Sequence, residues 1–226
     1  MWNRRELKER GKAAFKANYW NCVLVALILT ALIGGGAAAG RDRAQNASGE
    51  TSLVEELRQA PVQVLGVIGG ALIGVSAIAS AVKFLVFNPL EVGCKRFFLV
   101  NSDTPAQLNE LGYGFQNGYG NMVVSMFLRD LFTFLWALLF IIPGIVKSYS
   151  YAMVPYILAE NPDLSGTEAI RISQQMMKGH KWRAFVLDLS FIGWYVLAVL
   201  TAGIAEVLWV APYVGATDAE LYKAIR

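Results

Sequence analysis

The chain has 226 residues, of which 55% are hydrophobic and only 16% are charged. A soluble globular domain carries roughly a quarter charged residues, so this composition argues against a soluble fold. A single histidine and two cysteines exclude His-cluster metal sites, Ser-His-Asp triads and disulfide frameworks. The charges are also segregated, because the gap between Arg58 and Lys83 is longer than the ~20 apolar residues that cross a bilayer.

Residues 2–18 are strongly basic, with a sparser apolar set that includes Trp2 and Phe15. This pattern predicts an amphipathic helix on an anionic membrane face, or equally the positive flank of the first membrane span. Either interpretation places the N-terminus in the cytoplasm. The residues that we expect to contact lipid here are Arg4, Arg5, Lys8 and Lys12.

Two apolar stretches follow, with a polar segment between them. They predict membrane spans at about 19–39 and 61–82, joined by a short non-cytoplasmic loop. Ala37-Ala38-Ala39 resembles a cleavage site, so a removed signal peptide competes with the first span. The long basic helix before it favours an uncleaved span.

Three glycines of the second span recur every four residues, at Gly66, Gly70 and Gly74. They share one helix face, so they predict close packing against another helix. Small residues are also common in membrane helices for other reasons. The pattern therefore concerns packing and indicates no chemistry.

The segment 83–120 returns to the cytoplasmic side. Asn88-Pro89 breaks the helix here, and the apolar run 97–100 indicates a stretch along the membrane interface. No glycine spacing in this segment matches a phosphate-binding loop.

A third and a fourth span are predicted at about 122–142 and 145–159. Pro143-Gly144 stops the third span and leaves few residues to link the two. We therefore expect a tight antiparallel hairpin.

The clearest local signal is the capping box Ser165-Gly166-Thr167-Glu168, which marks the start of a helix. Gly179, fourteen residues after Ser165, marks the end of that helix. An apolar stripe lies between them, so residues 165–179 predict an amphipathic helix on the cytoplasmic face. An aromatic residue flanked by cations follows, which is typical of an interfacial anchor. The lipid-contacting residues expected here are His180, Lys181, Trp182 and Arg183.

A fifth span at about 184–200 and a short sixth at about 204–216 complete the predicted bundle. The alternative is one long fifth helix and an outside C-terminus. With six spans, fifteen lysines and arginines fall in cytoplasmic segments and three in the first outer loop, which satisfies the positive-inside rule. We expect one all-α integral membrane domain over residues 1–226, a polytopic helix bundle with both termini in the cytoplasm.

Four charges fall within or near the predicted spans and invite a functional interpretation: Arg129, Asp130, Asp188 and Glu206. Glu206 is expected near the outer surface, in contact with water, and Lys147 lies near the outer end of the fourth span, where its side chain can reach the interface. Ionisable groups at membrane depth are costly and suggest a proton or ion path by default. The structural alternatives are a neutralising Arg129–Asp188 pair that fixes helix packing, or residues that lie at the interface. The structural interpretation is favoured.

No spacing in the chain selects catalytic residues, a metal site, a cofactor site or nucleic-acid binding. We therefore expect a non-enzymatic membrane protein that engages membrane lipids, a membrane-protein partner or a second copy of itself. The alternative is a small transporter or channel that uses the intramembrane charges between the helical hairpins, because spans interrupted by Gly or Pro are a pointer to transport sites.

The stretches 135–153 and 177–182 resemble an uncharacterised bacterial multi-pass membrane family, domain of unknown function 975. Asn88-Pro89-Leu90 and Pro212-Tyr213 also fit that family. The Pro-Gly-Ile hairpin followed by an amphipathic helix is similar to the membrane domain of some glycerophosphodiester phosphodiesterases, whose chemistry belongs to a separate soluble domain. The resemblance implies a bacterial inner-membrane protein of six spans and supplies no catalytic residues.

Overall fold

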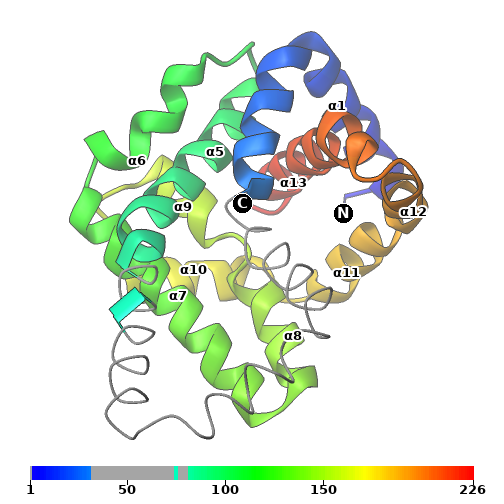
Figure 1. The fold of residues 1–226 in the computed structure, drawn as a ribbon. Helices are drawn as coiled ribbons and strands as arrows, with labels where there is room; N and C mark the ends of the chain where they lie inside the picture. Colours follow the sequence, from blue (N-terminus) through cyan, green and yellow to red (C-terminus); the bar gives the residue numbers. More distant parts are fainter. Residues whose placement is uncertain (1, 32–73, 76–80) are drawn as a thin grey trace, which may run out of the picture.

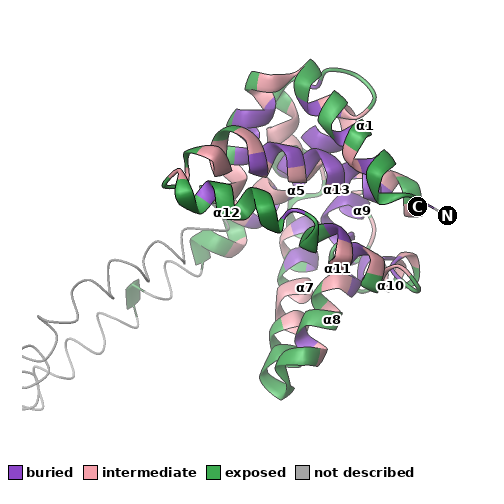
Figure 2. Ribbon diagram, turned by 90° about the vertical axis from the view of Figure 1, so that its right-hand side faces the viewer, coloured by how far each residue is buried: buried purple, intermediate pink, exposed green. Residues whose placement is uncertain are grey.

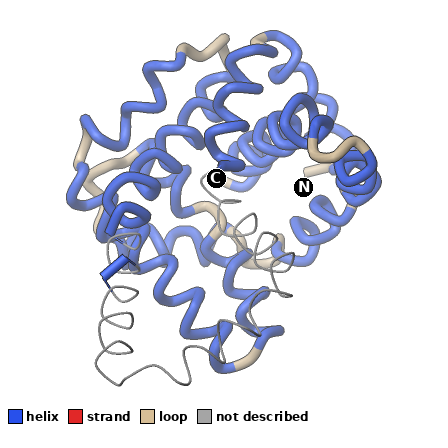
Figure 3. The backbone as a smooth tube through the Cα atoms, viewed as in Figure 1, coloured by secondary structure: helices blue, strands red, loops and turns tan. Residues whose placement is uncertain are grey.

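A computed structural model of the chain describes residues 2–31, 74–75 and 81–226. Throughout these ranges the regular structure is helical, and they contain no strand (Figure 1, Figure 3). The all-helical fold that the sequence predicts is therefore confirmed for the described residues.

The helices follow one another with short connections (Figure 3). The first, α1, covers Arg4–Ala17, and a helix over Tyr19–Ala31 follows it at a bend of 107°. The later elements are η1 (Lys83–Phe87), α5 (Asn88–Asn101), η2 (Leu108–Gly112), α6 (Tyr113–Gln116), α7 (Tyr119–Leu139), α8 (Ile141–Tyr151), α9 (Val154–Glu160), α10 (Gly166–Met176), α11 (Lys181–Leu189), α12 (Ile192–Leu200), η3 (Glu206–Val210) and α13 (Ala211–Ile225). Of the three short η segments, η1 and η3 are π-helical and η2 is a 3-10 helix.

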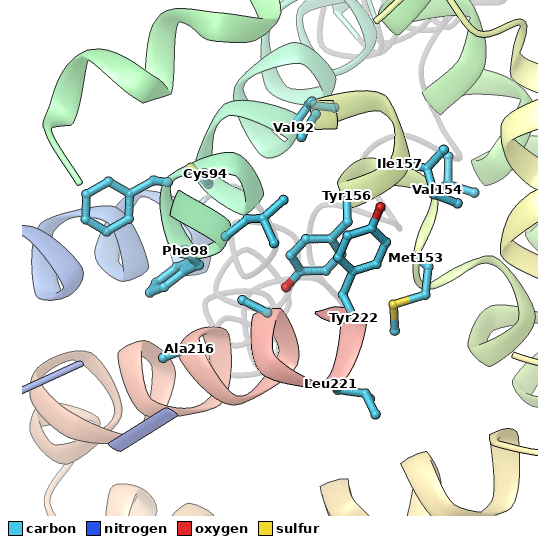
Figure 4. Close-up of a cluster of buried hydrophobic side chains, with 14 of the residues drawn as sticks. Val92, Cys94, Phe98, Met153, Val154, Tyr156, Ile157, Ala216, Leu221 and Tyr222 are labelled. Atoms are coloured by element: carbon cyan, nitrogen blue, oxygen red, sulfur yellow. The ribbon is translucent and has the colours of Figure 1, made fainter. Parts of the chain in front are cut away.

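The hydrophobic core lies where α5, α9 and α13 meet (Figure 4). The rings of Tyr156 and Tyr222 stack there, with centroids 5.1 Å apart and an angle of 16° between planes. Phe97 and Phe98 of α5 are 0% and 1% exposed, so the prediction that residues 97–100 follow the membrane interface is wrong. An aromatic run suits a core helix as well as an interface, because large rings gain most from burial of either kind.

The basic helix α1 packs along α13. Leu7, Gly11 and Phe15 form its buried stripe. A Cβ atom on Gly11 would lie 2.7 Å from Oγ1 of Thr217, so this position requires glycine for the close approach of the two helices. The amphipathic helix expected near the N-terminus is thus present, with its apolar face against α13.

Two core helices begin in the same way. A five-residue π-helical segment leads into Asn88-Pro89 at the start of α5, and another leads into Ala211-Pro212 at the start of α13. A proline within a helix lacks the N–H donor, and its ring clashes with the carbonyl four residues earlier. A wide π turn relieves the clash. In both segments the residue before the proline donates its N–H to the carbonyl five residues back, that of Lys83 or Glu206.

The carbonyls that these prolines leave free accept hydrogen bonds from tyrosines. Leu85, four residues before the proline of α5, accepts from the Tyr119 hydroxyl at 2.9 Å. Leu208, in the same position relative to the proline of α13, accepts from the Tyr19 hydroxyl at 3.1 Å. The two helix starts therefore share the π-helical segment, the proline and a tyrosine hydroxyl that donates to the freed carbonyl.

The α7–α8 hairpin projects from the core (Figure 2). The chain reverses at Phe140, whose backbone is extended (φ −156, ψ 142), and not at Pro143-Gly144. Proline is tolerated in the first helical turn, where its missing N–H needs no partner. Gly144 allows the two helices to touch, because a Cβ atom there would lie 2.7 Å from Cα of Ala137.

Two described helices are long and apolar enough to cross a membrane, Tyr119–Leu139 and Lys181–Leu200. The second combines α11 and α12. A third candidate appears if α1 and Tyr19–Ala31 are counted as one bent span. The predicted count of six is not reached in the described part of the chain, which excludes nearly all of the span expected at 61–82.

The fourth predicted span, 145–159, is divided in the structure. The helix α8 ends at Tyr151, and α9 begins at Val154 and is buried through Ala159. The division brings α9 into the core beside α5, where it contributes Tyr156. The sequence lacks a local signal for the break, since Pro155 stands in the first turn of α9 and fits there without strain.

The capping box corresponds to α10. Ser165 is its N-cap, and the hydroxyl accepts a hydrogen bond from the backbone N–H of Glu168 at 3.3 Å. Ala169, Ile170 and Ser173 are buried on the inner face of the helix. Gly179 follows with φ +81, a left-handed conformation that favours glycine after a helix end.

Candidate functional site

The charges near the third predicted span form one closed cluster. Arg129 of α7 donates two hydrogen bonds to Glu91 of α5, from Nη1 to Oε1 at 2.7 Å and from Nη2 to Oε2 at 3.1 Å. The same guanidinium donates to Oδ1 of Asp130 at 3.0 and 2.7 Å. Lys83 lies 3.8 Å from the other oxygen of Asp130. Bidentate charged pairs are strong and directional. Each charged group of the cluster therefore has an oppositely charged partner within the cluster.

Asp188 of α11 lies outside this cluster. Its Oδ2 accepts a hydrogen bond from the hydroxyl of Tyr149 at 2.6 Å. The predicted contact between Arg129 and Asp188 is therefore wrong. The helix α7 packs on α5, which presents Glu91 to the guanidinium, whereas α11 packs on α8.

A second ion pair joins the two repeated helices. Nζ of Lys95 in α5 lies 3.7 Å from Oδ2 of Asp218 in α13. Each of these residues stands six positions after the proline of its helix, so the pair connects equivalent positions of the repeat. A separation of 3.7 Å is too long for a hydrogen bond, and the attraction is electrostatic.

Two cavities meet at this ion pair, and Lys95 and Asp218 line both of them. The larger, of about 300 Å³, extends toward η3, and the smaller, of about 130 Å³, extends toward α8 and α11. The larger cavity is also lined by Leu29, Thr30, Tyr195, Glu206, Ala211, Val214 and Gly215. The smaller is also lined by Tyr149, Ala152, Met153, Tyr156, Met177, Ala184, Asp188 and Leu221. The larger cavity opens to the surface and is mainly apolar, and the ionisable side chains along both cavities offer hydrogen-bonding partners to water.

Acidic groups outnumber basic groups along these cavities. Asp218 is common to both, Glu206 lines the larger one and Asp188 the smaller one, and among the described lining residues Lys95 is the one cation. Burial raises the pKa of Asp218 to about 6 despite the opposing charge of Lys95, and the negative charge of Asp188 adds to the increase. Asp218 therefore holds a proton more readily than an ordinary aspartate.

Tyr156 adds an unsatisfied polar group to the smaller cavity. Its side chain is 1% exposed, and its hydroxyl has no hydrogen-bond partner in the part of the chain that the structure describes. Figure 4 shows its ring beside that of Tyr222. Buried hydroxyl groups are nearly always bonded, and the polar group beside this tyrosine is the ammonium of Lys95, which lies 5.3 Å from the centre of its ring.

An apolar groove of about 390 Å³ lies between α8 and α11. Lys181 is the one charged residue among the described residues that line it. Trp182 is 73% exposed, and its ring lies 5.3 Å from that of Phe185. The rest of the lining comes from Ile142, Ile145, Val146 and Tyr149.

Several residues expected to contact lipid have protein partners. Nε1 of Trp2 donates to Nδ1 of His180 at 3.1 Å, and Arg183 donates to the backbone carbonyl of Trp2. Lys8 donates to the carbonyl and the hydroxyl of Ser190 at 3.1 and 2.9 Å. These contacts tie the N-terminal segment to both ends of α11. Three further predicted residues are exposed on α1: Arg4, Arg5 and Lys12.

The remaining predictions concern packing and metals. Gly66 and Gly70 lie outside the described residues, and a Cβ atom on Gly74 would meet nothing within 4 Å in the described part. Cys22 and Cys94 are buried and unbridged. Within the described ranges no group of three or more His, Cys, Asp or Glu residues is placed to hold a metal ion.

Sequence reasoning placed Asp188 among the candidate residues but missed Lys95, Tyr156 and Asp218. Lys95 lies in a segment assigned to the cytoplasm, and Asp218 is far away along the chain. One signal was available: two X-Pro dipeptides are each followed six residues later by a charged residue, and the two charges are opposite in sign.

No curated protein and no solved structure matches the chain. A family model described as "Protein of unknown function (DUF975)" matches residues 139–226, a range that includes Asp188 and Asp218 but not Lys95. None of these matches involves a glycerophosphodiester phosphodiesterase, so that resemblance stays a prediction. The chain from the end of α7 to its last residue is thus similar to an uncharacterised family, the proteins of unknown function DUF975.

Proposed function

We propose that the protein is a non-enzymatic integral membrane protein of the bacterial inner membrane that engages phospholipid. The observation that carries this proposal is the exposure of large apolar side chains at two projecting regions. At the end of the α7–α8 hairpin, Ile141 and Ile142 are 78% and 76% exposed, and at the end of α12, Val199 and Leu200 are 74% and 78% exposed. Extended exposed apolar surfaces mark membrane or partner contacts, and the stretches 132–146 and 189–205 that carry these side chains contain no charged residue.

The charges support one orientation. The N- and C-termini lie at the same end of the molecule, away from the end of the hairpin (Figure 2), because α1 packs along α13. The exposed cations of α1 lie at this end as well. Under the positive-inside rule this end faces the cytoplasm. Both termini are then cytoplasmic, as the sequence pattern predicts.

Within this arrangement the groove between α8 and α11 fits one phospholipid. An acyl chain matches the apolar lining, and the anionic phosphate matches Lys181. Trp182 is suited to headgroup depth, where amphipathic rings gather. The adjacent cation Lys178 is exposed and does not line the groove, so it provides a matched control.

The test has two parts. Membranes from expressing cells are extracted with alkaline carbonate, and the protein should remain in the pellet. Native mass spectrometry of purified protein should then show bound phospholipid, reduced at least threefold by Lys181→Ala combined with Trp182→Ala and unchanged by Lys178→Ala. Release by carbonate would contradict membrane insertion, and equal lipid retention in all variants would contradict the groove.

A second candidate function, a small transporter or channel, is favoured by the cavities at Lys95 and Asp218. Of the charges that the sequence offered for this role, Arg129 and Asp130 are bound into a closed cluster. Asp188 lines a cavity. A transport role therefore centres on the ion pair of the repeated helices and not on Arg129.

A further inference from the structure

We propose that the protein carries protons along a path of carboxylates that runs from Glu206 through Asp218 to Asp188. This inference rests on the membrane insertion proposed above and concerns a region separate from the lipid groove. Its basis is geometric: each carboxylate lies where one cavity meets the next or where the path ends.

Three cavities follow one another in this order. A cavity of about 420 Å³ lies at the turn between α12 and η3, and it shares Tyr195 and Glu206 with the cavity of about 300 Å³. The latter shares Lys95 and Asp218 with the cavity of about 130 Å³, which ends at Asp188. Oxygen atoms that accept a proton therefore recur at every junction.

The size and charge of the path select the proton as cargo. A cavity of about 130 Å³ has the volume of roughly four water molecules at ~30 Å³ each. In the part of the lining that the structure describes, three carboxylates stand against one ammonium, which disfavours an anion. The positive charge of Lys95 at the central junction disfavours a metal cation there. A proton passes along water and hydroxyl groups in the space that remains.

Each transfer is balanced without another reagent. An O–H bond forms on a carboxylate oxygen of Asp218 as an O–H bond of a hydronium ion in the larger cavity breaks. The reverse exchange on the side of the smaller cavity returns Asp218 to the ionised form. The hydroxyl groups of Tyr156, which lines the smaller cavity beside Lys95, and of Tyr149, which contacts Asp188, extend the chain of proton carriers.

The surroundings of Asp218 allow it to change its charge. The groups that face it from the packed elements, directly or across the cavities, are Lys95 of α5, Tyr149 of α8, Tyr156 of α9, Asp188 of α11, Tyr195 of α12 and Glu206 of η3. Lys95 compensates the ionised form at 3.7 Å without fixing it by a hydrogen bond. Asp218 lies where the two repeated helices α5 and α13 meet, and transporters also place coupling-ion sites at the interface between structural repeats.

The experiment uses purified full-length protein in liposomes of phosphatidylethanolamine and phosphatidylglycerol that enclose a pH-sensitive dye. A potassium diffusion potential set with valinomycin drives protons inward. We expect acidification at least fivefold faster than in protein-free liposomes. Asp218→Asn should reduce the protein-dependent rate at least tenfold, and Asp103→Asn, an exposed carboxylate paired with Lys223, should leave it unchanged.

Glu206→Gln provides a second test, because Glu206 lies outside the hydrophobic core and its loss should not prevent folding. It should lower the rate at least threefold at equal reconstituted protein. Wild-type acidification no faster than in protein-free liposomes would overturn the proposal, and so would full rates in folded Asp218→Asn or Glu206→Gln. If the protein resists carbonate extraction but conducts no protons, the proton path is refuted and the proposed function stands. If carbonate releases the protein from the membrane, the proposed function is refuted.

Discussion

Two ion pairs extend from neighbouring turns of α5, and they differ in nearly every respect. Glu91 is held by Arg129 through two hydrogen bonds of 2.7 and 3.1 Å. Lys95, one turn later, lies 3.7 Å from Asp218 with cavities around it. A fully hydrogen-bonded pair fixes the packing of two helices, whereas a loose pair beside open space is free to change its charge. We therefore infer that the first pair serves structure and the second serves function.

The pKa values of the two acids depart from their ordinary values in opposite directions. Burial acts to raise the pKa of Glu91, but the charge and hydrogen bonds of Arg129 outweigh it and hold the pKa below its usual range. Burial raises the pKa of Asp218 to about 6, since the single loose contact with Lys95 does not compensate for it. Glu91 of α5 thus favours its charged form, whereas Asp218 of α13, which α5 approaches through Lys95, favours its protonated form.

The largest expected effect is on the tight cluster. Arg129→Gln leaves Glu91 buried without its partner, and the unpaired charge should cost about 3–5 kcal/mol of unfolding free energy. Thermal unfolding in detergent micelles measures the loss. The control Arg171→Gln removes an exposed cation that lies 3.5 Å from Glu168, and it should cost at most about 1 kcal/mol. Equal losses in the two variants would show that the cluster is not structural.

The pH dependence of stability distinguishes the two acids. Because the folded-state pKa of Asp218, about 6, exceeds its ordinary value of 3.8, the folded protein binds an extra proton between these values. Its contribution to stability should be present at pH 4 and lost as pH rises through about 6, by up to ~3 kcal/mol. Unfolding of wild type and Asp218→Asn between pH 4 and 7.5 measures it, and the variant should lack this term.

Glu91 should behave in the opposite way over a lower range. Since its folded-state pKa is lowered, its contribution is present above its ordinary value and lost as the solution becomes more acidic. In Asp218→Asn, where the other acid is absent, stability should fall as pH drops below about 4.5. An Asp218→Asn protein whose stability rises in that range would contradict the assignment of Glu91 as the locked acid.

The smallest effects test the repeat that carries the functional pair. Tyr119→Phe and Tyr19→Phe each remove one hydrogen bond to a carbonyl freed by a proline. Each should cost about 0.5–1.5 kcal/mol of unfolding free energy. Tyr113→Phe, which removes a hydroxyl without such a role, is the control. Losses confined to one of the two variants would show that the two helix starts are not equivalent.

Local patterns in the sequence predicted what depends on local interactions. The cap at Ser165 follows from neighbouring residues, and so does the apolar hairpin around Pro143. The sparse apolar set in residues 2–18, which includes Trp2, Leu7 and Phe15, predicted an amphipathic helix. It did not predict the surface that the stripe covers, because a lipid face and α13 are equally apolar.

The candidate site depends on packing between distant segments, so the sequence revealed only part of it. Asp188 attracted notice because it interrupts an apolar run, but its partner Tyr149 comes from another helix. Asp218 gave no such signal, since it follows Thr217 in a mixed segment that contains other charges. Its raised pKa results from burial among α5, α11 and α13, and no local pattern encodes that burial.

The contrast between the two pairs is tested most directly by a hydrophobic carbodiimide, which modifies protonated carboxyl groups in apolar surroundings. Membranes that contain the wild-type protein are treated at pH 6.5, and peptide mass spectrometry locates the adducts. We expect modification of Asp218, with slower reaction at pH 8, and none at Glu91. Modification of Glu91 at a rate equal to or above that of Asp218 would contradict the assignment of one structural and one titrating pair.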